Sequence, residues 1–387
     1  VIDPANGIDG PADVAIRDGR IAAVDPRLAI AGVGTEIDVS GRYVTPGIID
    51  MHAHVFHTHR RSDLSLEPRV RTLSSGVTTV VDAGTAGWRD FAEFRTEVID
   101  RAKIRVLAYV NIVGSGMGGE WEHDAREMSP KLAAAMAEEH KDVVVGIKTA
   151  HYWAKRPFDA DHLPWTAVDG AVKAGELCGM PVMVDFYPWL PERPYPELIL
   201  ERLRPGDIHT HVFAQQFPVI DERGRVYDHL FKARERGIIF DLGHGAGSFW
   251  FRNAVPAMRQ GFVPDSISTD LHTGNVNGPV VDMVTTMSKM LNLGLTLPDV
   301  IAKSTVAPAR EIGRPELGTL SVGAEADVAV LALDRGSFGF VDCGKFRYTG
   351  DRLLRCVLAL RAGEIVYNPD GQGLPSWETD PPGPPRD

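Results

Sequence analysis

Eight short apolar segments alternate with helix-like stretches along this chain, and this alternation constrains the fold more than any other feature. The apolar segments cover residues 44–50, 77–82, 104–112, 143–148, 181–186, 207–212, 238–242 and 266–269. Helical candidates lie between them at residues 88–101, 130–140, 165–178, 195–203, 227–236 and 251–260. Continuous apolar strands that alternate with helices predict a parallel sheet covered on its outer face. We therefore predict an α/β protein built on a (β/α)8 TIM barrel.

A doubly wound open sheet is the alternative reading of the same alternation. No Gly-x-Gly-x-x-Gly pattern follows the first apolar strand, so a dinucleotide-binding fold has no support.

The two ends of the chain differ from its middle. Short strand-like segments separated by turn residues occur at 12–16, 20–24 and 36–39, and again at 326–331, 353–359 and 363–367. We predict that both ends form one small β-sandwich, from residues 1–45 plus 317–387, beside a barrel of residues 46–316. The last stretch, rich in proline and glycine, is expected to be a tail.

Bulk properties narrow the class of partner. A net charge of −11 disfavours nucleic acid and anionic membrane surfaces as partners, and it says nothing specific about the substrate. No apolar run is long enough to span a membrane, and no signal peptide is visible, which favours a cytoplasmic protein. The chain opens on Val1 instead of methionine, so a removed signal peptide stays open. The three cysteines give no disulfide framework and no zinc-finger spacing.

Two histidines follow the first barrel strand, one residue apart. His52 and His54 come at the end of an apolar run, where residues i and i+2 of a strand point to the same side. Both imidazoles can therefore converge on one metal ion, although two solvated loop histidines would look the same in sequence.

The other predicted strands also end in residues that bind metals. These residues are Lys148, Asp185, His209, His211, His244 and Asp270. The carboxyl ends of barrel strands meet at the active-site face, so we expect these side chains to lie close together. Nitrogen and oxygen donors without cysteine suit zinc, manganese or iron.

Several segments resemble the amidohydrolase superfamily. The segment 46–54 reads PGIIDMHAH, and a strand-4 lysine and a strand-8 aspartate accompany it. The segments 206–211, 240–249 and 267–272 resemble the deacetylase branch, whose members are often called dihydroorotase-like, and 317–327 resembles the usual re-entry into the sandwich. The resemblance covers almost the whole chain.

The resemblance implies a role for each matched position. His52 and His54 would bind one metal, and Asp270 would bind the same metal and shuttle a proton. Lys148 would react with carbon dioxide to give a carbamate that bridges two divalent metals, zinc or alternatively manganese or iron. The second metal would take His211, which its sequence context favours over His209.

The chain departs from the family pattern at two places. Asp185 stands where relatives usually have histidine, so either Asp185 completes the second metal site or His244 or water does. Ala150 stands where many relatives have arginine, so an anion-binding contact with the substrate is either missing or replaced, for example by His151 or Tyr152.

These assignments imply a metal-dependent hydrolase that cleaves a C–N amide bond through a metal-bridged hydroxide. The substrate would be an N-acyl compound or a small cyclic amide. Asp270 would pass the proton to the leaving nitrogen, His244 would contact the substrate or polarise the oxyanion, and His272 is a further substrate-binding candidate. An esterase on the same binuclear site and a catalytically inactive scaffold are the alternatives. Superfamily members often form homo-oligomers, so assembly is possible by analogy.

Overall fold

The computed structural model of this chain describes residues 1–29, 32–58 and 64–379. Seven parallel strands form its central sheet: β6 (Ile48–Ala53), β7 (Val77–Gly87), β8 (Arg105–Asn111), β9 (Val144–Thr149), β10 (Val182–Val184), β11 (Ile208–His209) and β12 (Ile239–Phe240). They lie side by side in chain order, from β6 at one edge to β12 at the other. A parallel sheet in sequential order is the arrangement of a barrel wall.

An eighth segment closes the barrel, although it forms only isolated bridges. Ser266 pairs in parallel with Asp241 next to β12, and Leu271 pairs in parallel with Ala53 of β6. The N–H of Leu242 donates to Ser266 O at 3.1 Å, and the N–H of His54 donates to Leu271 O at 2.9 Å. The segment thus joins both edges of the sheet, and the predicted (β/α)8 TIM barrel is confirmed.

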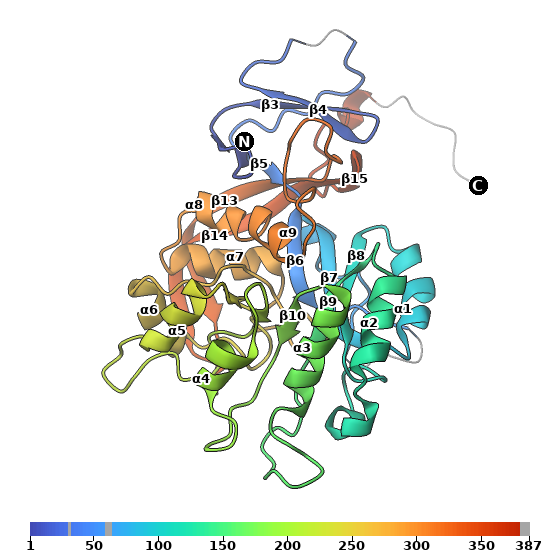
Figure 1. The fold of residues 1–387 in the computed structure, drawn as a ribbon. Coiled ribbons are helices and arrows are strands. Elements are labelled where there is room, and N and C mark those ends of the chain that lie inside the picture. Colours follow the sequence, from blue (N-terminus) through green and yellow to red (C-terminus); the bar gives the residue numbers. More distant parts are fainter. Residues whose placement is uncertain (30–31, 59–63, 380–387) are drawn as a thin grey trace, which may run out of the picture.

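Helices cover the outside of the barrel (Figure 1). The helices of the described residues are α1 (Phe91–Glu97), α2 (Pro130–Glu139), α3 (Thr166–Cys178), α4 (Tyr195–Glu197), α5 (Asp228–Glu235), α6 (Phe251–Arg259), α7 (Met283–Asn292), α8 (Leu297–Ala302) and α9 (Val306–Glu311), and α9 differs from the others in its contact with the barrel interior. Short 3-10 turns lie at Leu73–Ser75, Ile99–Arg101, Glu120–His123, Ala125–Glu127 and Trp377–Thr379, and a π-helical turn lies at Leu198–Arg202. No helix in the described ranges is both long and apolar enough to cross a membrane.

The strands alternate between two buried faces. In β8, Leu107 and Tyr109 belong to a cluster inside the barrel, while Val106, Ala108 and Val110 pack in the layer beneath the helices. This is the period of two expected of a strand buried on both sides. Ala309 and Ile312 join the inner cluster, so α9 packs against the inside of the barrel.

The strands of both chain ends gather beside the barrel, at the top of Figure 1. An antiparallel sheet has the order β15-β14-β13-β5, formed by β15 (Glu364–Tyr367), β14 (Arg347–Arg361), β13 (Val328–Val341) and β5 (Tyr43–Pro46). Two hairpins accompany it, β1 (Ile2–Asp3) with β2 (Ile8–Asp9) and β3 (Asp13–Arg17) with β4 (Arg20–Asp25). Ile21 of β4 shares a buried cluster with Val44, Val330 and Leu358 of the larger sheet.

The small antiparallel domain is therefore built from both termini, as the sequence predicts. Its division from the barrel at 45/46 and 316/317 stays a prediction, and residues 380–387 of the predicted tail lie outside the described residues. The strand predicted at 36–39 is wrong, because these residues pair with no described strand. Ile37 and Val39 pack against the domain's apolar core instead.

Two long strands tie the small domain to the barrel. β13 and β14 extend far beyond their predicted ranges, and β14 packs against α7. Asn292 of α7 donates from Nδ2 to Arg352 O at 2.7 Å, and its Oδ1 accepts from the N–H of Asp351 at 2.9 Å. The long strands thus form part of the barrel's outer covering.

Candidate metal centre

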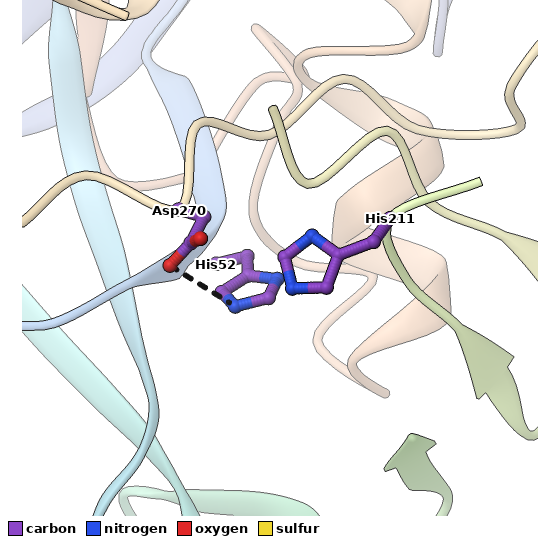
Figure 2. Close-up of side chains that lie close together, drawn as sticks. All are labelled: His52, His211 and Asp270. Carbon is purple, nitrogen blue, oxygen red and sulfur yellow. Dashed lines mark ion pairs between the residues drawn. The ribbon is translucent and has the colours of Figure 1, made fainter. Parts of the chain in front are cut away.

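Three side chains from distant parts of the chain meet at the carboxyl ends of the barrel strands. His52 ends β6, His211 follows β11, and Asp270 follows the closing segment. One possible ligand atom from each lies within 4.8 Å of the others, and Figure 2 shows the three side chains close together. All three residues are buried.

His54 joins this group through Asp270. The Nε2 atom of His54 lies 2.9 Å from Asp270 Oδ1, and the Nε2 atom of His52 lies 3.6 Å from the same oxygen. Burial alone would raise the pKa of Asp270, but the hydrogen bond and charge of His54 outweigh it and lower that pKa. Burial, with the charges of Lys148 and His211, lowers the pKa of His52 well below its usual value. His52 is therefore neutral, the form that binds metals.

The imidazoles are held with their Nε2 atoms toward the centre. Thr210 donates its hydroxyl to Asp241 at 2.7 Å, so its oxygen accepts the Nδ1 proton of His52 at 2.9 Å. His211 Nδ1 lies 2.6 Å from Gly243 O, which can only accept, so this nitrogen also carries the proton. Such outer partners fix the tautomer and ring orientation of metal-binding histidines.

Lys148 lies in β9 with its amine fully buried. Its Nζ has no hydrogen-bond partner among the described residues, and burial lowers its pKa. The charges of Asp185, Asp270 and Asp241 act in the opposite direction and raise that pKa. A buried polar group without partners costs roughly 2–7 kcal/mol. The site therefore lacks a group that would satisfy this nitrogen, and a covalent carbamate together with metal ions fits that requirement.

Gly84 makes room for this lysine. Its φ is +78°, and a Cβ added there would lie 2.5 Å from Lys148 Cβ. The next residue, Thr85, lies 2.8 Å from His54 Nδ1 through its hydroxyl. The end of β7 therefore helps to position both Lys148 and His54.

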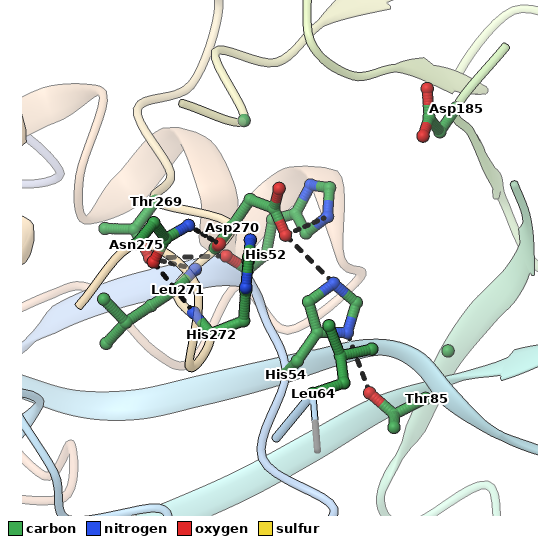
Figure 3. A network of polar contacts seen from close by, with 12 residues as sticks. His52, His54, Leu64, Thr85, Asp185, Thr269, Asp270, Leu271, His272 and Asn275 are labelled. Atoms are coloured by element: carbon green, nitrogen blue, oxygen red, sulfur yellow. Dashed lines mark hydrogen bonds and ion pairs between the residues drawn. The ribbon is translucent and has the colours of Figure 1, made fainter. Parts of the chain in front are cut away.

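Asp185 lies at the edge of this centre. Its Oδ2 is 3.6 Å from His211 Nε2 and 3.3 Å from His151 Nε2, and Glu122 Oε2 lies 3.2 Å from His151 Nδ1. Burial would raise the pKa of Asp185, but the neighbouring His211 and His151 lower it strongly. Figure 3 shows Asp185 apart from the network of Asp270 and His54. Asp185 is thus close enough to His211 for the two side chains to share a metal.

Three of the predicted site residues have left-handed backbone conformations. The φ angles are +54° at His151, +65° at His211 and +50° at Asp270. Such conformations are uncommon for residues other than glycine and cost about 1–3 kcal/mol each. They cluster here at the ends of strands, as strained residues at functional sites do.

Comparison with known proteins identifies the family. A deacetylase of Agrobacterium fabrum is 33% identical over 326 residues, which cover 82% of this chain and 77% of that protein. The chain belongs to the amidohydrolase family. A family model described as "Amidohydrolase family" matches residues 251–360. A deacetylase of Enterococcus faecalis is 30% identical over 92% of this chain and 96% of that protein.

Solved structures agree with this assignment. A crystal structure of an adenine deaminase superposes with a TM-score of 0.85 at 30% identity, covering 94% of this chain and 97% of that chain. A dihydroorotase structure gives a TM-score of 0.79 at 31% identity, covering 92% and 95%. This amidohydrolase is therefore an enzyme that hydrolyses carbon–nitrogen bonds other than peptide bonds.

His244 of this amidohydrolase is not part of the group formed by His52, His211 and Asp270. The side chain is fully buried and stacks on Phe249, with ring centroids 4.6 Å apart. Its Nε2 lies 2.7 Å from Lys289 Nζ, and its Nδ1 lies 3.0 Å from Gly245 O. The expected substrate contact, oxyanion contact or metal ligation by His244 stays a prediction, and both of its ring nitrogens have protein partners in this structure.

The two remaining histidines, His209 and His272, lie in different surroundings. His209 faces the outer layer between Tyr195 and Phe217, where burial lowers its pKa to about 3. His272 lies at the rim, with its ring 6.2 Å from that of His54, and its Nδ1 accepts the N–H of Gly274. Its Nε2 therefore carries the proton, so His272 can donate a hydrogen bond to a substrate.

Tyr152 and His151 both line a small cavity beside Asp185, together with Thr149 and Arg193. The first two are predicted substrate-binding residues, whereas Arg193 is not among the predicted site residues. Thr210 and Asp241, which support His52, are also missing from the prediction. Strand periodicity gives a weak signal for Asp241, which is polar within the apolar run 238–242. Nothing in the sequence marks Arg193, because its surroundings come from separate loops.

Proposed function

We propose that this amidohydrolase is a metal-dependent enzyme that cleaves the C–N amide bond of an N-acyl compound or a small cyclic amide. The observation that carries the proposal is the partnerless, buried Nζ of Lys148 among aspartates, beside the His52, His211 and Asp270 group. The relatives named deacetylase favour an N-acyl substrate, and those named dihydroorotase favour a cyclic amide.

The donor set supports two divalent metal ions, with zinc as the first choice and manganese or iron as alternatives. His52, His54 and Asp270 would hold one ion, and His211 with Asp185 would hold the other. Lys148 would lie between them as a carbamate, formed when its neutral amine adds carbon dioxide and releases a proton. This change replaces a cation, which would repel the metals, with an anion that binds them.

Bound divalent metals would lower the pKa of water from about 15.7 toward about 7 and polarise the carbonyl oxygen. The chain's own part is proton transfer and positioning. Asp270 Oδ1 faces His52 and His54, so we assign proton transfer to Oδ2, which would take a proton from water and give it to the leaving nitrogen. Gly245 permits this, because a Cβ there would lie 2.6 Å from Oδ2. The rim nitrogen of His272 would orient the substrate.

The test is a screen of protein loaded with zinc or manganese in bicarbonate buffer. Substrates are N-acetyl amino acids, cyclic imides and acetylated hydroxy acids, with acetate or ring opening as the readout. We expect amide hydrolysis that a chelator abolishes and about two metal ions per chain. Hydrolysis of the esters alone would replace the proposal with an esterase.

Lys148 has its own test in the same assay. Lys148→Ala should lose metal and activity, and bicarbonate with a short carboxylic acid should restore part of both. Full activity of this variant without metal would refute the proposed centre.

A further inference from the structure

One buried cation near the proposed centre has no counterion. Arg193 is 3% exposed, and no carboxylate in the described ranges lies within ion-pairing distance of it. Its Nη1 donates to Tyr152 O at 2.8 Å, while its Nε and Nη2 atoms have no hydrogen-bond partner among the described residues. Burying an unpaired charge is costly, which implies that Arg193 binds a negatively charged group from outside the described residues.

The two free nitrogens form one edge of the guanidinium group. An arginine binds a carboxylate side-on with two parallel N–H bonds, and this edge has that geometry. The group is held in place, because its carbon lies 4.9 Å from the ring centre of Phe158 and 5.2 Å from that of Phe186. Burial lowers the pKa of Arg193 to about 10, so it keeps its charge at neutral pH.

The cavity that Arg193 lines shares Asp185 with the proposed metal centre, and Ala167 and Val168 of α3 line another side of it. Thr149, which follows Lys148 in β9, and Asp185 form part of the same wall. Asp185 is an anion, but His151 lies 3.3 Å from it and offsets its charge. Arg193 is therefore the unpaired charge on a cavity that Asp185, a proposed metal ligand, also lines.

We propose that Arg193 is a specificity residue that binds a carboxylate of the substrate through its Nε and Nη2 atoms. This inference rests on the proposed function and narrows it to anionic substrates, with N-acyl amino acids as the matching class. The carboxylate would enter the small cavity while the amide lies over the metal centre. Arg193 sits on the loop that follows β10, so this loop would select the substrate.

The experiment compares matched substrates on the metal-loaded enzyme. N-acetylalanine and N-acetylphenylalanine are each paired with the neutral carboxamide, and acetate release gives kcat/KM. We expect the wild type to prefer the carboxylates, and Arg193→Gln to lower kcat/KM for them about 10- to 100-fold. The carboxamides should change less than threefold, and Arg193→Lys should keep an intermediate preference.

Arg156→Gln is the matched control. Arg156 lies on the neighbouring loop, pairs with Glu120 and does not line the cavity, so this variant should keep the wild-type preference. A wild type without preference for carboxylates, or an equal loss on both members of each pair, overturns the inference. In either case amide hydrolysis itself still supports the proposed function.

If no amide is hydrolysed, the proposed function fails and a binding measurement decides the inference. Succinate should raise the melting temperature of the metal-loaded wild type and of Arg156→Gln, but not that of Arg193→Gln. Equal stabilisation of all three proteins would overturn carboxylate binding by Arg193.

Discussion

At the residue scale, hydroxyl groups decide how the imidazoles of this site point. Thr210 lies between His52 and Asp241. Its hydroxyl donates to the buried Asp241 carboxylate and accepts from Nδ1 of His52, so it fixes how the His52 ring is oriented. Asp241 also accepts from Ser266 and Ser268, which keeps it in place without Thr210. The effect of removing the hydroxyl should therefore be confined to His52.

Thr210→Val removes this hydroxyl at nearly constant volume. We expect metal affinity to fall about 10- to 100-fold, because His52 loses the partner that fixes its tautomer. Competition with a chromogenic chelator measures the affinity. Thr210→Ser keeps the hydroxyl and should bind metal like the wild type. Unchanged affinity in Thr210→Val would show that Thr210 does not orient His52.

Gly84→Ala tests the space reserved for Lys148. The new Cβ would meet Lys148 Cβ at 2.5 Å in a backbone of φ +78°, so both stability and metal content should fall. Gly179→Ala is the control, since Gly179 has φ +66° and nothing within 4 Å of an added Cβ. The Gly179→Ala variant should lose only the cost of placing alanine in a left-handed backbone conformation, about 1–2 kcal/mol of unfolding free energy. Urea unfolding and metal analysis separate the two, and equal effects would argue against a steric role.

The sequence predicts the side chains that would supply the metal ligands, but it does not predict the side chains that surround and orient them. His52, Lys148, His211 and Asp270 end predicted strands, and a barrel gathers strand ends at one face. Arg193 reaches its cavity from a loop whose path depends on contacts with Phe158 and Phe186. The contact between Lys289 and the Nε2 atom of His244 is likewise visible only in the fold, and the predicted role of His244 stays a prediction.

At the element scale, the local sequence pattern predicts the first six helices along the chain and misses the last three. The six helical candidates all contain helix, although 195–203 is a short α4 followed by a π-helical turn. The pattern predicts no helix between 283 and 311, where α7, α8 and α9 lie. β14 extends well before its predicted start because residues 347–352 pair with residues 335–341 of β13, a tertiary effect that no local window contains.

Asn292 is the main polar link between α7 and β14. Its Oδ1 accepts from the N–H groups of Asp351 and Arg352, and its Nδ2 donates to Arg352 O. Asn292→Ala should cost about 2–3 kcal/mol of unfolding free energy, because backbone groups lose their partners. Asn292→Asp keeps the acceptor and should cost less. Denaturant unfolding gives both values, and equal losses would assign the effect to the donor alone.

At the scale of the whole molecule, one polar chain runs through the barrel from the α9 side to the metal centre. Glu311 of α9 interacts with Ser266, which donates to Asp241, and Asp241 accepts from the Thr210 hydroxyl beside His52. The orientation of His52, at the carboxyl ends of the strands, is thus connected through hydrogen bonds to the carboxyl group of Glu311 in α9. Tyr109 lies in the barrel interior close to the same carboxyl groups.

Glu311 makes the stability of the molecule depend on pH in a predictable direction. Burial raises its pKa from 4.5 to about 8, and its Oε2 has no partner among the described residues. Between these values the folded state keeps a proton that the unfolded state has lost, so stability should fall as pH rises from about 4.5 to about 8. The slope from this one group approaches about 1.4 kcal/mol per pH unit.

Glu311→Gln removes that titration while keeping a neutral side chain of the same size. The stability of the variant relative to the wild type should therefore increase steadily from pH 5 to pH 8, by about 1.4 kcal/mol per unit at most. Taking the difference between the two proteins cancels the pH dependence of metal binding that they share. Glu316→Gln, at an exposed position of the following turn, should show no such increase. A constant difference between wild type and Glu311→Gln would mean that Glu311 is ionised in the folded barrel, and Lys303, whose charge lowers the pKa of Glu311, would then be its counterion.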